Sequence, residues 1–98
     1  MHKVVINTCF GIFSLSREAE DWLNTNYNIK PSEYLDLARH DPRLIECVET
    51  LGSEANGLFS NLKIVEIKGR IYKIDNYDGK EQIIEPDDIN WIIINPNE

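Results

Sequence analysis

The sequence predicts an α+β domain: an N-terminal strand, two to three short helices, and then an antiparallel meander of about four strands forming one sheet. A length of 98 residues is that of a single domain, so residues 1–98 are taken as one unit. Apolar residues recur at helical spacing in the first half of the chain, whereas short β-branched runs alternate with turns in the last third. This change of period separates the helices from the meander.

Residues 3–7, KVVIN, form a β-branched run that predicts a strand covered on both faces. Ser16 is typical of a helix N-cap, and the carboxylates that follow it in the first turns complement the helix dipole. Ala19 and Leu23 share one apolar stripe. These signals predict the first helix over residues 17–26.

Two further helices are expected before the meander. Residues 31–37 predict a short helix with Ser32 as its cap. The next helix is marked more clearly, because Asp41 is a typical N-cap, a proline follows it, and apolar residues then recur on one face. Gly52 stands where a helix C-terminus favours glycine, so this helix is predicted over residues 42–51.

The meander is expected to hold strands at residues 62–67, 70–75, 81–85 and 90–94, with the hairpin signal Asp78-Gly79 between the second and the third. The run from Trp91 to Ile94 is apolar on both faces, so it is either a central strand or a strand that lies against another chain. Because a chain of this length buries only a modest core, we expect a homo-oligomer.

Composition limits the partners. Ten Lys and Arg against 17 Asp and Glu give a net charge of −7, which disfavours nucleic-acid polymers and anionic membranes. No apolar run reaches the roughly 18 residues of a spanning helix. No signal-peptide pattern follows the N-terminus, so a cytoplasmic protein is expected. Two cysteines and two histidines without ligand spacing predict no disulfide framework, no metal and no cofactor.

The segment between the first strand and the first helix is the main candidate for a site. A strand, a loop with one glycine and a helix start follow one another, an arrangement in which backbone N–H groups can converge on an anion. The candidate ligand-binding residues in it are Asn7, Thr8, Cys9, Phe10, Gly11, Phe13, Ser14, Ser16 and Arg17. Phe10 and Phe13 could stack on a planar base. The alternative is an ordinary turn with both rings in the core, since neither a Walker A loop nor a dinucleotide fingerprint is present.

A second candidate group precedes and opens the helix at 42–51. It consists of Arg39, His40 and Arg43. Arg43 is a cation in the first turn, where the helix dipole opposes it, so it is a candidate for holding an anionic ligand. The alternative is an ion pair of Arg43 with Asp41 or Glu46. Arg17, Arg39 and Arg43 would converge if both helix starts lie at the same end of the sheet.

A third hypothesis is nucleophilic. Cys9 precedes a helix start, and His40 with Asp41 could complete a Cys-His-Asp set. The alternative is a thiol that only packs in its loop. Nothing in the spacing requires catalysis, so no enzyme is expected.

Several segments resemble a family of small proteins from tailed bacteriophages and prophages. Residues 4–16, VVINTCFGIFSLS, are similar to its opening I-N-x-C-F/Y-G-G-F-G-L-S. Residues 41–52 resemble its D-P-x-L and V-x-x-L-G segments, residues 62–67 its L-x-V-V-E-I segment, and residues 77–79 its Y-D-G hairpin. The chain departs from the family pattern at Ile12 and Ser14, where the family has glycine, and at its C-terminus.

The resemblance implies phage origin and work in the cytoplasm of an infected bacterium. We therefore expect a small non-catalytic binding protein that sequesters a phosphate-bearing, nucleotide-derived signal of host antiviral defence. One alternative is an acidic protein–protein inhibitor of a host enzyme or defence complex, which the net charge of −7 also suits. A second alternative is a small enzyme that uses Cys9.

Overall fold

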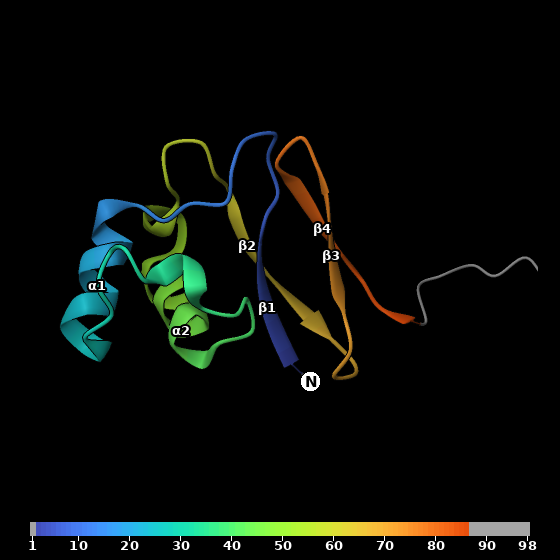
Figure 1. Cartoon of the computed structure of the whole chain (residues 1–98), viewed down its shortest axis with the longest axis horizontal. Helices are drawn as coiled ribbons and strands as arrows, with labels where there is room; N and C mark the ends of the chain where they lie inside the picture. Colours follow the sequence, from blue (N-terminus) through green and yellow to red (C-terminus); the bar gives the residue numbers. More distant parts are fainter. Residues whose placement is uncertain (1, 87–98) are drawn as a thin grey trace, which may run out of the picture.

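The computed structural model describes residues 2–86 and confirms the α+β class (Figure 1). Its elements in chain order are β1 (His2–Asn7), α1 (Arg17–Tyr27), the 3-10 helix η1 (Tyr34–Asp36), α2 (Pro42–Leu51), the 3-10 helix η2 (Gly52–Ala55), β2 (Leu62–Ile67), β3 (Lys73–Tyr77) and β4 (Lys80–Ile84). Over residues 2–86, no helix has the length and apolar composition needed to cross a membrane. The strand predicted at 90–94 lies outside the described residues.

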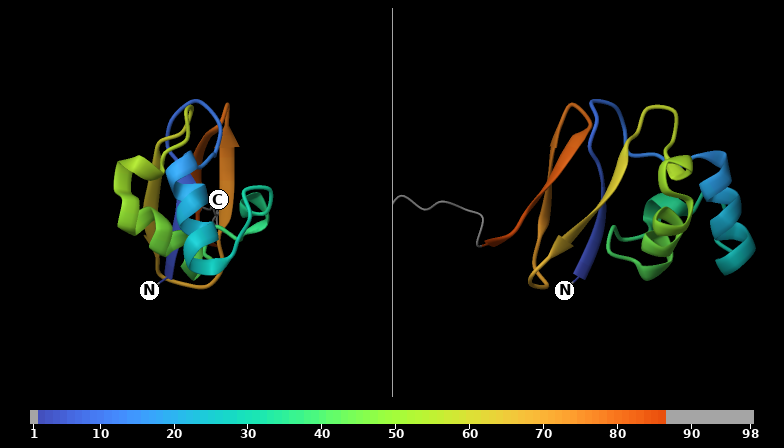
Figure 2. Two further views of the ribbon diagram at one scale, coloured as in Figure 1. Left: turned by 90° about the vertical axis from the view of Figure 1, so that its left-hand side faces the viewer. Right: turned by 180° about the vertical axis from the view of Figure 1, so that it is seen from behind.

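The described strands form two sheets of two strands each, which corrects the prediction of one sheet. β1 pairs antiparallel with β2, with Val4 opposite Val65, and β3 pairs antiparallel with β4. The helices lie on one side of the β1–β2 sheet and the β3–β4 hairpin on the other (Figures 1 and 2). The physical reason is that the β1–β2 sheet is apolar on both faces, so each face needs a covering layer.

Each face of this sheet belongs to its own core. Val4 and Val5 are neighbours on β1, are both 0% exposed, and point to opposite faces as strand geometry requires. Val5 packs in the core of the helices, with Leu23 and Leu44 at its centre. Val4 packs in the second core with Ile67 and the hairpin. The strand at residues 3–7 is therefore covered on both faces, as predicted.

Local signals place the helix ends correctly. The Ser16 hydroxyl accepts a hydrogen bond from the Ala19 N–H at 3.1 Å and caps α1. The Asp41 carboxylate accepts from the Arg43 N–H at 2.9 Å and caps α2. Gly52 follows α2 with a φ of +58°, a left-handed conformation that favours glycine.

Two predicted elements differ from the structure. Only the single turn η1 forms within residues 31–37, and its N-cap is Glu33, with no side-chain cap, instead of Ser32. β3 spans Lys73–Tyr77 instead of 70–75, because the two-residue turn Asp78-Gly79 fixes the register of the hairpin from its tip. Both turn residues have positive φ, +54° and +89°, as a type I′ turn requires.

α1 and α2 run in opposite directions (Figure 1). At the start of α1 the Ser16 hydroxyl donates to the Glu54 carbonyl in η2, just beyond the end of α2, at 2.5 Å. At the end of α1 the Tyr27 hydroxyl bonds to Glu46, which lies in the first half of α2. The N-termini of the two helices therefore lie at opposite ends of the helical layer.

Candidate functional site

Three loops meet at one end of the protein, and we call them together the loop end. They are residues 8–16 after β1, residues 56–61 before β2, and the turn at residues 77–80 between β3 and β4. Figures 1 and 2 show them side by side along one edge, although they come from distant parts of the chain. Most of the residues predicted to bind a ligand lie here, so the geometry of these loops decides the candidate site.

Asn7, the last residue of β1, ties the three loops together and is 0% exposed. Its side-chain amide donates to the carbonyls of Cys9 at 3.1 Å and Gly79 at 2.8 Å. Its side-chain oxygen accepts from the backbone N–H of Asn61 at 2.8 Å. One buried side chain thus bonds to each of the three loops, which gives Asn7 a structural role.

Glycines let the backbones of these loops touch. A Cβ on Gly11 would overlap the Phe59 carbonyl, and a Cβ on Gly79 would overlap the backbone of Gly11. The Ile12 N–H donates to the same Phe59 carbonyl at 3.0 Å. At these two glycines the loop backbones therefore lie in direct contact, in addition to the bonds that the Asn7 side chain makes.

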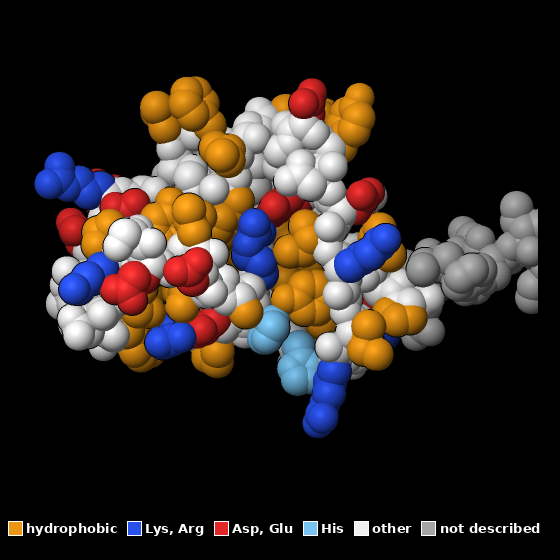
Figure 3. Space-filling view, viewed as in Figure 1, with side chains coloured by type: hydrophobic (Ala, Val, Ile, Leu, Met, Phe, Trp, Pro, Cys, Tyr) orange, Lys and Arg blue, Asp and Glu red, His pale blue; other side chains and the backbone are white. Residues whose placement is uncertain are grey.

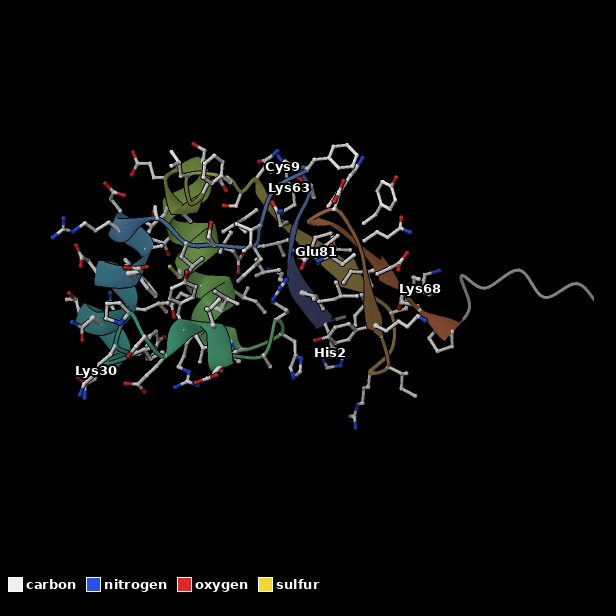
Figure 4. All side chains as sticks on the ribbon, turned by 45° about the horizontal axis from the view of Figure 1, so that its top comes forward. His2, Cys9, Lys30, Lys63, Lys68 and Glu81 are labelled. Atoms are coloured by element: carbon white, nitrogen blue, oxygen red, sulfur yellow. The ribbon has the colours of Figure 1, made fainter. Side chains whose placement is uncertain are left out.

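An ion pair lies beneath the loop end, between β1 and the hairpin, where Figure 4 labels Glu81. The Arg39 guanidinium bonds to both carboxylate oxygens of Glu81, at 2.6 and 3.0 Å. Glu81 also accepts from the backbone N–H of Asn7 at 2.8 Å. The guanidinium carbon lies 3.5 Å from the centre of the Phe13 ring. The Arg39 guanidinium is therefore engaged by the Glu81 carboxylate and by the Phe13 ring.

Several donors of the predicted anion loop already have protein acceptors. The backbone N–H groups of Thr8 and Ser16 donate to carbonyls of Asn61 and Ala55, at 2.8 and 2.9 Å. The Thr8 hydroxyl donates to the Asn61 carbonyl as well. The Ser14 carbonyl accepts from Ser60, so this segment is bonded into the loop before β2. These hydrogen bonds hold the loops together.

The predicted convergence of three arginines is wrong. Arg17 starts α1 and Arg43 starts α2, and these starts lie at opposite ends of the helical layer. The alternative for Arg43 is confirmed, since it forms an ion pair with Asp41 at 2.7 Å. The hydrogen bond from the Arg43 side chain lowers the pKa of Asp41 below its ordinary value. Arg39 is likewise paired with Glu81, so these three arginines do not form one anion site.

The cysteine hypothesis has no support in the geometry. The Cys9 thiol bonds to the Asn7 side-chain oxygen and to the Phe59 carbonyl, each at 3.3 Å, and Figure 4 labels it at the loop end. His40 bonds to the Tyr72 hydroxyl at 2.7 Å and lines a cavity together with His2, at the other end of β1. A six-residue strand spans roughly 17 Å. The predicted set of Cys9, His40 and Asp41 is therefore not assembled.

Large apolar side chains project from the loop end, and we call these five residues the apolar rim. They are Phe10 (66% exposed), Ile12 (62%), Leu58 (89%), Phe59 (65%) and Tyr77 (74%). Figure 3 shows apolar side chains standing out along the same edge of the molecule. The alternative that placed both rings of the first loop in the core is wrong for Phe10. Leu58 and Phe59 were not among the predicted site residues, although two large apolar residues in a loop after Gly57 were a usable signal.

Comparison of the chain with protein-family models, with curated proteins and with solved structures finds no match. The resemblance to phage proteins therefore stays a prediction. Among residues 2–86, no group of three His, Cys, Asp or Glu side chains is arranged to hold a metal ion.

Proposed function

We propose that this protein is a non-catalytic binding protein that docks onto a partner protein through the apolar rim. The observation that carries the proposal is the projection of five large apolar side chains from three loops whose backbones are locked together. Apolar side chains gathered in this way are a common mark of a protein interface.

The hydrogen bonds that hold the three loops of the loop end together favour tight docking. The fully buried Asn7 side chain bonds to all three loops, so the rim side chains stand on a fixed backbone. A preorganised surface loses little conformational entropy when it binds. Aromatic anchors such as Phe10 and Phe59 each contribute about 2 kcal/mol when they enter a partner pocket.

The partner chemistry follows from the charge of the chain. With a net charge of −7, the protein is attracted to a partner with a basic surface around an apolar pocket, and this attraction raises the association rate at low salt. If the resemblance to phage proteins holds, the partner is a host enzyme or defence complex in the bacterial cytoplasm, and docking would inhibit it.

The test compares rim variants with an equally exposed control. Tagged wild-type protein, Phe10→Ala, Phe59→Ala and Leu35→Ala are used to capture partners from bacterial lysate. Leu35 is 66% exposed, like Phe10, but lies in η1 away from the loop end. We expect one stoichiometric partner with the wild type and Leu35→Ala, and at least tenfold less of it with either rim variant. Equal capture by all four proteins would contradict docking through the rim.

A second candidate function is sequestration of a nucleotide-derived signal, and one observation at the rim favours it. Phe10 packs edge-to-face on Tyr77 with ring centres 6.2 Å apart, and the Lys80 ammonium lies 5.2 Å from the Phe10 ring centre. A base could stack on Phe10 while Lys80 neutralises a phosphate.

Isothermal titration calorimetry with cyclic dinucleotides, cyclic trinucleotides and ADP-ribose tests this candidate. Binding that Phe10→Ala and Lys80→Gln both abolish would support it. No heat with any of these ligands would remove it, while the capture experiment would still decide on a protein partner.

A further inference from the structure

A cavity of about 560 Å³ opens at the end of the protein opposite to the loop end. It is lined by residues of β1, of α2 and the segment just before it, of the end of β2 and of the segment between β2 and β3, among them His2, His40, Ile45, Arg70 and Tyr72. Figure 3 shows the histidine side chains at this edge, next to basic and apolar side chains, and Figure 4 labels His2 there. Its volume is in the range of pockets that hold small organic molecules.

One wall of the cavity is apolar. Ile45 of α2 and Ile67 of β2 belong to it, and the Tyr72 ring packs edge-to-face on His40 with ring centres 5.8 Å apart. Burial raises the pKa of Tyr72, and its hydroxyl is hydrogen-bonded to Nδ1 of His40 at 2.7 Å. This wall offers aromatic and aliphatic contact to the body of a ligand.

Some of the charged side chains around the cavity already have partners within the protein. Lys3 and Glu49 neutralise each other at 3.0 Å. Glu46, on the α2 wall, accepts from the Tyr27 hydroxyl. Arg70 forms no ion pair within residues 2–86, and it is exposed at the mouth of the cavity. A guanidinium presents paired N–H donors that match a carboxylate or a phosphate group.

We propose that this cavity binds a small organic anion, in which an apolar ring or branched chain lies against Ile45, Ile67 and Tyr72 and a single anionic group faces Arg70. In the tautomer in which Nδ1 of His40 accepts from the Tyr72 hydroxyl, the Nε2–H of His40 is a further donor, and His2 also lines the cavity. This site lies away from the apolar rim and does not depend on the function proposed for it.

The test uses four probes on the full chain, measured by NMR titration of backbone amides: phenyl phosphate, phenylacetate, benzyl alcohol and inorganic phosphate. We expect phenyl phosphate or phenylacetate to bind at least tenfold more tightly than benzyl alcohol and inorganic phosphate, with shifts confined to residues that line the cavity. Which of phenyl phosphate and phenylacetate binds shows whether the site prefers a phosphate or a carboxylate group.

Variants then test the assigned residue. Arg70→Gln should weaken the binding at least fivefold, whereas Lys68→Gln removes a charge two residues away, outside the cavity lining, and should change it less than twofold. The inference is overturned if neither organic anion binds, if inorganic phosphate binds equally well, or if Arg70→Gln has no larger effect than Lys68→Gln. Unchanged amide spectra of both variants would show that they keep the fold.

Discussion

Arg39 and Glu81 lie 42 residues apart in the chain and form a bidentate ion pair, with hydrogen bonds of 2.6 and 3.0 Å. The Glu81 side chain is 4% exposed and that of Arg39 is 22% exposed. The pair joins the hairpin to the segment before α2, and Glu81 also receives the backbone N–H of Asn7. A buried carboxylate with three donors is well satisfied, and it becomes costly when one partner is removed.

Breaking this ion pair should destabilise the protein strongly. We expect Arg39→Gln to lower the free energy of unfolding by about 3 kcal/mol, because it leaves the Glu81 carboxylate buried without its counter-charge. Urea denaturation measures this, with Lys3→Gln as control, since its pair with Glu49 is exposed and is worth less than about 1 kcal/mol. Equal losses for both variants would refute a structural role for the Arg39–Glu81 pair.

Asn7 should control the order of the loop end. Asn7→Ala removes the acceptor of the Asn61 N–H and the donor to the Gly79 carbonyl, so we expect a loss of about 3 kcal/mol. Hydrogen exchange should show faster exchange at the Asn61 amide in particular. Asn26→Ala, which loses one exposed bond to the Trp22 carbonyl, should cost less than about 0.5 kcal/mol. Unchanged protection of Asn61 in Asn7→Ala would count against the proposed link.

The contact between the hairpin tip and the first loop should depend on Gly79. An alanine Cβ there would overlap the backbone of Gly11, and the φ of +89° disfavours any side chain. We expect Gly79→Ala to destabilise the fold by about 3 kcal/mol in thermal or urea unfolding. Gly69 is the matched control, because a Cβ added there would meet no heavy atom within 4 Å. A Gly69→Ala effect as large as that of Gly79→Ala would mean that backbone contact is not the cause.

Stability should fall at high pH because of Cys47. Burial in the helical core raises the pKa of this thiol from about 9 to about 11. The folded state therefore holds the proton more tightly than the unfolded state, so this contribution is complete below pH 9 and is lost as the pH rises towards 11. Urea midpoints between about pH 8 and 11 should drop less steeply in Cys47→Ala than in wild type. Parallel curves would show that burial of the thiol does not contribute.

Much of the fold was predictable because its signals are local. Ser16, Asp41 and Gly52 mark helix ends through bonds or backbone angles that involve residues at most four positions away. The turn at Asp78-Gly79 is equally local. The division into two sheets was not predictable in this way, because it depends on which layer covers each face of β1.

The candidate site was predicted in part. The first loop does lie at the exposed end of the molecule, and Phe10 projects from it. That loop contacts Phe59 and Gly79, which lie far from it in the chain. The spacing of residues within the loop does not predict these contacts. The three arginines failed to converge because α1 and α2 are antiparallel, and helix direction follows from packing.

The sequence by itself determined the class of this protein, the ends of its two α-helices, its acidic charge and the tip of its hairpin. Only the tertiary structure decided that Asn7, Arg39 and Glu81 form the polar centre beneath three loops, and that the five residues of the apolar rim face outward. The reason is physical: caps and turns are set by bonds between near neighbours, whereas ion pairs and surfaces are set by which distant segments the packing of the cores brings together.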